Sequence, residues 1–182
     1  MDFRDHPLSA IFVLSMSIWR PLIIANPNIM AAQLPDNILY EGEKMDLYSN
    51  PLENYWALRN KKRPNFYWTP ICKRGYVATW EIIDNQLILR SIDGNVEKRY
   101  FLFWKKPVRC TLKMIFSKAG VGGVKASWFS GKIRIPQGKR TLYVHNEYDS
   151  RFEREMVITV EQGNVVKTVV LDYIQQKLQV AG

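Results

Sequence analysis

The sequence predicts a mainly β domain in which roughly nine antiparallel strands form a barrel or a sandwich. From residue 38 onward, apolar and polar residues alternate with a period closer to two than to 3.6. Turn residues interrupt these runs about every ten residues, which leaves no room for the crossover helices that parallel strands need. With 182 residues, of which 47% are hydrophobic and 24% charged, the chain has the size and composition of one globular domain.

The first 32 residues differ from the rest, so we divide the chain into an N-terminal segment, 1–32, and a single β-rich domain, 33–182. Residues 8–19 are apolar and uncharged. This run is too short for a membrane-spanning helix, which needs about 20 residues, but is typical of an export signal. We therefore expect no transmembrane span. The alternatives to an export signal are a translation start near Met30 and an N-terminal helix that packs on the domain or anchors it to a membrane surface.

The domain is expected to begin with a hairpin and a short helix. Residues 38–47 alternate on either side of a turn at Gly42. Residues 51–59 form the best helix candidate, because Asn50 is a suitable N-cap and Pro51 fits the first helical position. We expect this helix to cover one opening of the barrel or sandwich.

The remaining strands are predicted from alternation between turn residues. Asp84-Asn85 indicates a tight turn. Asp93-Gly94 is the strongest hairpin signal, because a primed turn needs positive φ at both central residues. Pro136-Gln137-Gly138 and Gln162-Gly163 indicate two more turns, and residues 117–125 a flexible loop. The expected strands are 75–83, 86–92, 96–104, 109–116, 127–135, 140–145, 155–161 and 164–171, followed by a short helix at 172–178.

The two cysteines and two histidines exclude a disulfide-dense scaffold and a structural zinc site. Cys72 and Cys110 have no metal or redox spacing. In an exported protein they could form a disulfide. The alternative is that Cys110, on the strand face shared by Leu112 and Met114, is a buried free thiol. We expect no cofactor and no metal.

The glycine-rich loop at residues 118–125 does not fit a phosphate-binding loop. Such a loop needs glycine before its lysine, Ser or Thr after it, and a helix beyond. Here Val124 precedes Lys125, Ala126 follows it, and a strand is expected next. We interpret this segment as a hairpin loop.

The densest polar stretch, residues 143–153, contains the only histidine of the domain, His145. Glu147 or Asp149 could orient this imidazole as a general base, and Arg151 could bind an anion. No nucleophile motif accompanies it, so we assign no catalytic residue. The stretch also fits a long connection whose polar side chains satisfy its own turns. The candidate residues of a small-molecule site are Arg134, Gln137, Tyr143, His145, Tyr148 and Arg151.

The net charge of +9 belongs to the domain, because residues 1–32 contain equal numbers of basic and acidic residues. Basic pairs such as Lys98-Arg99 and Lys105-Lys106 alternate with aromatics such as Tyr100, Phe103 and Trp104. This pattern suits single-stranded nucleic acid, an acidic protein, a lipid headgroup or a cell-wall polymer. It also suits solubilising charges at strand edges around an aromatic core. The candidate basic and aromatic surface residues are Lys61, Lys62, Arg63, Trp68, Lys73 and Arg74.

Two stretches, NPLENYW at 50–56 and WFSGKIRIPQG at 128–138 followed by Tyr143-Val144-His145, carry a resemblance. They resemble small, uncharacterised bacterial proteins of about this size, many of which start with an export signal. The resemblance covers residues 36–170. It implies no reaction, ligand or catalytic residue, and it favours the export-signal interpretation of residues 1–32.

These observations favour a non-enzymatic binding protein of the bacterial envelope, periplasmic or secreted, that engages an acidic partner or an anionic surface through a basic face. An immunity protein, which occupies a toxin with a complementary charged face, is one example of this type. The alternative is a single-stranded nucleic-acid-binding β-barrel in the cytoplasm. A third hypothesis is an enzyme centred on His145.

Overall fold

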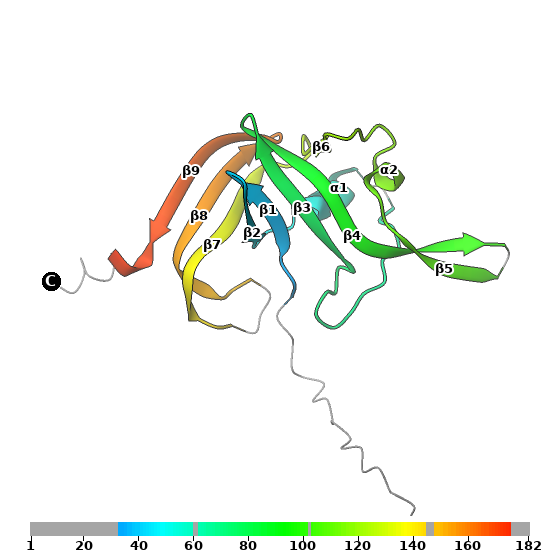
Figure 1. Ribbon diagram of the computed structural model, residues 1–182, viewed down its shortest axis with the longest axis horizontal. Helices are drawn as coiled ribbons and strands as arrows, with labels where there is room; N and C mark the ends of the chain where they lie inside the picture. The colour runs from blue at the N-terminus through cyan, green and yellow to red at the C-terminus, as the bar shows by residue number, and fades with distance from the viewer. Residues whose placement is uncertain (1–32, 60–61, 102, 145–147, 176–182) are drawn as a thin grey trace, which may run out of the picture.

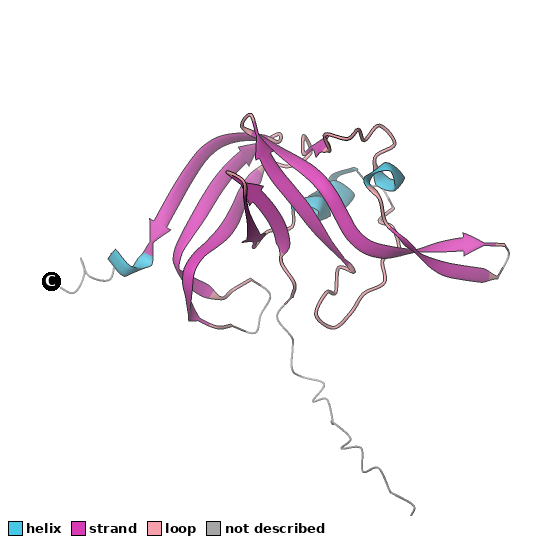
Figure 2. Ribbon diagram, in the orientation of Figure 1, coloured by secondary structure: helices cyan, strands magenta, loops and turns pink. Residues whose placement is uncertain are grey.

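The computed structural model describes residues 33–59, 62–101, 103–144 and 148–175, and its described part is mainly β, as the sequence predicts (Figures 1 and 2). Two short helices accompany the strands. The elements are β1 (Asp36–Tyr40), β2 (Glu43–Leu47), α1 (Pro51–Arg59), β3 (Tyr76–Ile83), β4 (Gln86–Tyr100), β5 (Trp104–Arg109), α2 (Leu112–Ile115), β6 (Val124–Lys125), β7 (Gly131–Leu142), β8 (Arg151–Glu161) and β9 (Asn164–Asp172).

The strands form one mixed sheet in the order β2-β1-β3-β4-β9-β8-β7, with β5 and β6 also paired to β4. The expectation that all strands are antiparallel is wrong at one place, because β1 and β3 run parallel. Between them the chain turns back through β2, passes through α1 and a long connection, and returns on the other side of β1. That length of chain supplies the crossover that a parallel pair requires.

The sheet is sandwich-like and is not closed into a barrel. β4 and β9 pair only at Gln86 and Asn164, and the two halves of the sheet diverge from this corner (Figure 1). The outer edges, β2 and β7, approach each other at the opposite side. There Tyr48 N, directly after β2, donates a backbone hydrogen bond to Arg134 O at 2.8 Å.

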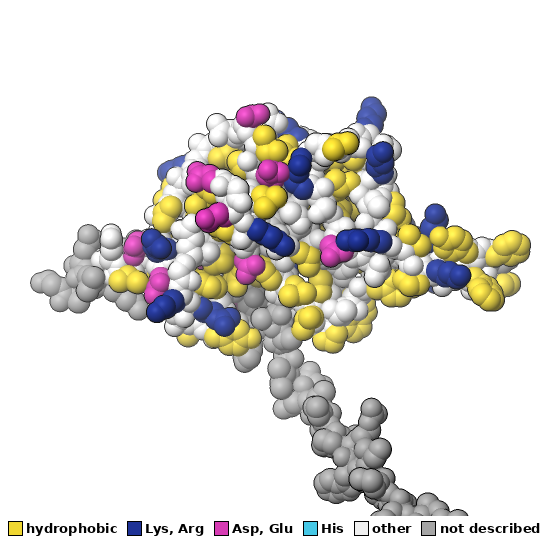
Figure 3. All heavy atoms as spheres, in the orientation of Figure 1, with side chains coloured by type: hydrophobic (Ala, Val, Ile, Leu, Met, Phe, Trp, Pro, Cys, Tyr) yellow, Lys and Arg dark blue, Asp and Glu magenta, His cyan; other side chains and the backbone are white. Residues whose placement is uncertain are grey.

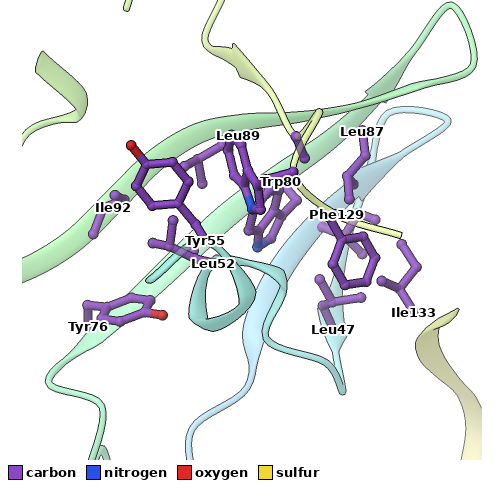
Figure 4. Packing of buried hydrophobic residues seen from close by; sticks show 14 of the residues in the cluster. Leu47, Leu52, Tyr55, Tyr76, Trp80, Leu87, Leu89, Ile92, Phe129 and Ile133 are labelled. Carbon is purple, nitrogen blue, oxygen red and sulfur yellow. The ribbon is translucent and has the colours of Figure 1, made fainter. Parts of the chain in front are cut away.

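The core fills the space between the two halves of the sheet, with α1 packed against it (Figure 4). Leu52 and Tyr55 of α1 are buried, and Trp128 Nε1 donates to the carbonyl of Pro51 at 3.0 Å. These contacts fix α1 against the core. The largest fully buried apolar side chains are Trp80, Tyr76, Ile38, Leu47, Leu52, Leu87, Leu89, Ile133, Ile135, Ile158 and Val160.

Several predicted elements are confirmed. The first hairpin turns at Glu41-Gly42, both at positive φ, and α1 spans residues 51–59. Asp84-Asn85 and Gln162-Gly163 also have positive φ, as tight hairpin turns require. At the C-terminus, Asp172 caps a helical turn at residues 173–175, and the rest of the predicted helix lies outside the described residues.

The predicted hairpin at Asp93-Gly94 is wrong. Both residues lie inside β4, paired with Val77 and Tyr76 of β3. A Cβ atom on Gly94 would lie 2.6 Å from Gly75 O and 2.9 Å from Tyr76 Cβ. The glycine therefore allows two strands to approach closely and does not form a turn. As a result β4 is 15 residues long, and the chain turns only beyond Tyr100.

Four further predictions in this half of the chain are corrected. The expected strand at 109–116 is wrong, because residues 112–115 form α2 and Met114 is exposed. The expected turn at 136–138 is a bulge inside β7, where Gly138 has φ +74° and the register with β8 shifts. The expected strand at 127–135 begins only at Gly131, and the loop at 117–125 ends in the short strand β6.

Candidate interaction surface

The outer parts of β4 and β5 project from the body as a two-stranded arm, seen at the right of Figure 1. We define the arm as residues 98–101 and 103–106. Its base is held by the connection after α1, where Tyr67 N donates to Asn95 O at 2.9 Å and Glu97 N to Asn65 O at 3.0 Å. Beyond Glu97, the described residues give the arm no backbone partner outside its own two strands.

The strand register of the arm places like charges opposite each other. Lys98 faces Lys106, and Arg99 faces Lys105. Like charges in directly opposed positions destabilise a β pair. Among the described residues one carboxylate relieves this repulsion, that of Glu97, which lies 2.8 Å from Lys105 Nζ. The local fold therefore concentrates positive charge at a place where it weakens the hairpin.

The free end of the arm carries exposed aromatic side chains. The exposed fractions are 45% for Tyr100, 90% for Phe101, 87% for Phe103 and 69% for Trp104. Figure 3 shows hydrophobic side chains gathered at this end of the molecule, with Lys and Arg beside them. Single exposed apolar residues are common, but a contiguous group at the end of a projecting element marks an interaction site.

Because side chains alternate between the two faces of a strand, every second residue of β4 and β5 lies on the same face of the arm. Val96, buried against the body, is followed on the same face by Lys98 and then by Tyr100. Across the strand pair, Lys106 and Trp104 hold the corresponding positions. Lys98 Nζ lies 5.6 Å from the centre of the Tyr100 ring, within the range of a cation–π contact. The arm thus runs from an apolar base through a cationic row to an aromatic end.

The sequence-predicted residues Arg74 and Tyr148 lie elsewhere, in a buried group around Asp36. Asp36 is fully buried, and its carboxylate lies 3.0 Å from Arg74 Nη2. It also accepts hydrogen bonds from Ala78 N at 3.0 Å and Trp80 Nε1 at 3.1 Å. Arg74 Nη1 donates to the hydroxyl of Tyr148. We call Asp36, Arg74, Tyr148 and Trp80 the Asp36 cluster.

Burial controls the ionisation of this cluster. Removal from water raises the pKa of Asp36 from 3.8 to about 6, although Arg74 and the two hydrogen-bond donors act in the opposite direction. Burial likewise raises the pKa of the Tyr148 phenol. At neutral pH the carboxylate and the guanidinium therefore form a buried ion pair that joins β1 to the segment before β3.

A second arginine of the predicted basic surface, Arg63, is also engaged inside the fold. Its Nη2 lies 3.1 Å from Glu53 Oε1 and donates to the carbonyl of Arg74 at 2.7 Å. The hydroxyl of Tyr76 donates to the same Glu53 oxygen at 2.7 Å. Arg63 and Arg74 thus connect α1, β1 and β3 and are not part of an open basic face.

The other predicted surface residues are more accessible. Trp68 is 69% exposed, and Lys62 and Lys73 are also exposed. Lys61 lies outside the described residues. Cys72 and Cys110 are both buried and are free thiols in the structure, each with its sulfur against a backbone oxygen, Tyr76 O for Cys72 and Thr111 O for Cys110.

Of the predicted small-molecule site, the structure shows a contact between Arg134 and Tyr148. Arg134 forms a two-point ion pair with the buried Glu155, with N–O distances of 2.7 and 3.1 Å, and its Nη1 lies 3.5 Å from Tyr148 O. Gln137 is half-buried in β7, Tyr143 and Arg151 are exposed, and His145 lies outside the described residues.

The part of the chain that the structure describes contains no group of three His, Cys, Asp or Glu side chains that could hold a metal ion. Within the same ranges, no helix is long and apolar enough to cross a membrane. The glycine-rich loop borders a shallow pocket lined by Tyr55, Phe116, Lys118 and Lys125, and no helix follows the loop in the described residues.

Comparison of the chain with family models, curated proteins and solved structures finds no match in any of the three. The arm is therefore interpreted from its own geometry. Sequence reasoning noted its basic pairs and three of its aromatics but did not group them as a site, and it missed Phe101. The signal that could have found it is Tyr-Phe-Leu-Phe-Trp, residues 100–104, between two basic pairs.

Proposed function

We propose that this chain is a non-enzymatic binding protein of the bacterial envelope that engages an anionic surface, and that its binding face is the β4–β5 arm. The observation that carries the proposal is the pair of facing cationic positions, Lys98 with Lys106 and Arg99 with Lys105. An anionic partner would remove the repulsion between these side chains, so binding would stabilise the hairpin that binds.

The contrast with the body supports this choice of face. Arg63, Arg74 and Arg134 each form an ion pair with a carboxylate of the body, which is fully or nearly buried for Arg74 and Arg134 and partly exposed for Arg63. The cations of the arm share only the carboxylate of Glu97 among the described residues. They are therefore available to a partner, and the net charge of +9 would speed association with any anionic surface.

The envelope location rests on the sequence. The apolar run at 8–19 is typical of an export signal, and the resemblance to bacterial proteins that start with such a signal points the same way. Cell fractionation together with N-terminal sequencing of the mature protein tests this part. A mature start near Gln33 in the periplasm is expected, and a cytoplasmic protein that starts at Met1 would contradict it.

The binding face is tested with two variants that lose the same number of positive charges, one in the arm and one elsewhere on the surface. The arm-charge variant is Lys98→Gln/Arg99→Gln/Lys106→Gln, and the body-charge variant is Lys44→Gln/Lys132→Gln/Lys167→Gln, at three exposed lysines outside the arm. Both lower the net charge equally. The probes are heparin and vesicles of phosphatidylcholine with one quarter phosphatidylglycerol, each titrated at low and high salt.

We expect the arm-charge variant to lose affinity by about fivefold for each charge, since a Lys or Arg near an anionic surface contributes about 1 kcal/mol. The body-charge variant is expected to lose much less, and high salt should remove the difference. Equal losses in the two variants would show that only net charge matters. No binding of the wild type to either probe would contradict the proposed function.

The nucleic-acid alternative keeps one supporting observation, the exposed Trp68 with the exposed Tyr67 beside it and Lys73 on the same connection. Base stacking on such a ring is how single strands are held. The closed barrel that this alternative assumed is not the architecture found. Salt-dependent binding of a single-stranded oligonucleotide that is lost in Trp68→Ala would favour it over the arm.

A further inference from the structure

We infer that the anionic surface is a lipid bilayer and that the aromatic end of the arm inserts into it. This inference rests on the proposed function and adds the class of partner and the mode of contact. It is drawn from the order of side chains along the arm, from how far the arm projects, and from the way its backbone is hydrogen-bonded.

The order of side chains matches the layers of one membrane leaflet. Lys98 and Lys106 stand nearest the body, Tyr100 and Trp104 come next on the same face, and Phe101 and Phe103 lie at the free end. Lys and Arg bind lipid phosphates, whereas Tyr and Trp prefer the interface and Phe prefers hydrocarbon. Each residue type therefore lies at the depth at which a bilayer would accept it.

The dimensions agree with shallow insertion. Phe101 is three positions beyond Lys98, which is at most about 10 Å along an extended chain. The headgroup region of one leaflet is roughly 5–8 Å thick. With the ammonium groups at the level of the phosphates, the two phenylalanine rings would reach the boundary of the hydrocarbon, the depth typical of proteins that lie on membranes.

The hairpin also limits the number of unpaired polar groups that would enter the membrane. Backbone groups without partners are costly in lipid, and paired strands satisfy them internally. Strand pairing in the arm continues outward to Tyr100 and Trp104, the last pair before the end. The aromatic side chains can therefore be buried while most of the backbone behind them stays hydrogen-bonded.

A soluble partner fits the same features less well. A single-stranded nucleic acid is bound by aromatics spaced along a basic groove, whereas this arm gathers its aromatics at one end. Lysine is depleted in protein interfaces, yet the arm has three lysines next to its exposed rings. A lipid bilayer accommodates both the clustered aromatic rings and the lysines beside them.

The test removes the apolar end and leaves the charges. The tip variant is Phe101→Ser/Phe103→Ser, and its matched control is Leu58→Ser/Val121→Ser, at two side chains outside the arm that are 69% and 104% exposed. Full-length proteins are titrated with the anionic vesicles, with pure phosphatidylcholine vesicles and with heparin. Hydrogen exchange of the peptide covering residues 98–106 reports whether the arm itself becomes protected.

We expect the tip variant to bind the anionic vesicles about 100-fold more weakly than the wild type, at about tenfold for each ring withdrawn from the membrane. The control variant should bind as the wild type does. Heparin binding should be the same in all three proteins. Anionic vesicles, but not heparin, should protect the ends of β4 and β5 near Phe101 and Phe103 from exchange.

Each other outcome overturns the inference in a distinct way. If the tip variant binds vesicles like the wild type while the arm-charge variant does not, the arm binds by charge alone and the proposed function stands without insertion. If the tip variant also loses heparin binding, the two phenylalanine rings contribute to binding an anion without any lipid, and insertion is not their role. If vesicles bind without protecting residues 98–106, another part of the chain makes the contact, and both proposals fail.

Discussion

The Asp36 cluster and the β4–β5 arm are built from the same residue types, arginine or lysine beside tyrosine and tryptophan, and use them in opposite ways. In the cluster, Arg74 faces the carboxylate of Asp36, and their side chains are only 12% and 0% exposed. In the arm, Lys98 faces Lys106, and both are exposed. The cluster therefore joins β1, the segment before β3 and the loop that carries Tyr148, whereas in the arm Lys105 alone has a carboxylate partner among the described residues.

This difference shows that the number of basic residues says little about where a basic protein binds. Arg74 and Arg63 belong to the basic surface predicted from the sequence, but both form ion pairs within the fold. The cations of the arm come from pairs that look like ordinary strand edges. What distinguishes the two regions is the group that the fold places beside each cation, a carboxylate for Arg74 and another cation for Lys98.

The largest expected effect is a difference in the free energy of unfolding between a substitution in the Asp36 cluster and one at the base of the arm. Asp36→Ala leaves the guanidinium of Arg74 buried without its carboxylate, so it should lower the free energy of unfolding by about 3–5 kcal/mol. Asp93→Ala is the control, because it removes the exposed Asp93–Arg109 pair at the base of the arm, where both side chains are more than two-thirds exposed. That change should cost less than about 1 kcal/mol.

Urea unfolding of both variants, followed by circular dichroism, measures this difference. Equal losses of stability in the two variants would show that the buried pair contributes no more than an exposed one. The comparison between cluster and arm would then fail.

The second effect is the pH dependence of the cluster. The folded state raises the pKa of Asp36 from 3.8 to about 6, so between these values the folded protein holds a proton that the unfolded chain has released. The contribution of Asp36 to stability is therefore fully present below about pH 4 and falls by about 3 kcal/mol as the pH rises to 6. It levels off above about pH 7.

Asp36→Asn isolates this contribution, because its side chain does not titrate. The difference in unfolding free energy between wild type and Asp36→Asn should fall from pH 4 to pH 6. A difference that rises over the same range would mean that Arg74 outweighs burial and that the pKa of Asp36 lies below its usual value.

The sequence predicts the local structure where the chemistry is local. The helix that begins at Pro51, and the turns at Asp84-Asn85 and Gln162-Gly163, depend on a few adjacent residues, and these predictions are confirmed. Asp93-Gly94 has the same local signal and fails, because the distant Gly75 and Tyr76 pack against Gly94. A glycine required for a turn cannot be told from one required for close packing without the partner strand.

The site was harder to predict for the same reason. Alternation shows which residues share a strand face but not which residues face them, so the sequence did not reveal the opposition of Lys98 to Lys106. Nor did it show that Arg74 and Tyr148, 74 residues apart, would meet beside Asp36. Both facts depend on register and long-range packing. The predicted turn at Asp93-Gly94 hid the arm. In the structure the chain turns only beyond Tyr100, and this later turn is what creates the projecting hairpin.

The smallest expected effect has the opposite sign to the first. Lys106→Gln removes one member of a facing like-charge pair, so it should stabilise the arm by about 0.2–1 kcal/mol at low salt. The expected readout is hydrogen exchange that is slower by about 1.4-fold to fivefold at the backbone amides that pair β4 with β5 beyond Glu97. High salt should remove the gain, because these exposed charges are screened. Lys44→Gln, on β2 at the far edge of the sheet, should leave exchange in the arm unchanged. If Lys106→Gln instead speeds exchange, the cation stabilises the hairpin, and the argument that the arm gives up stability to present its charge is wrong.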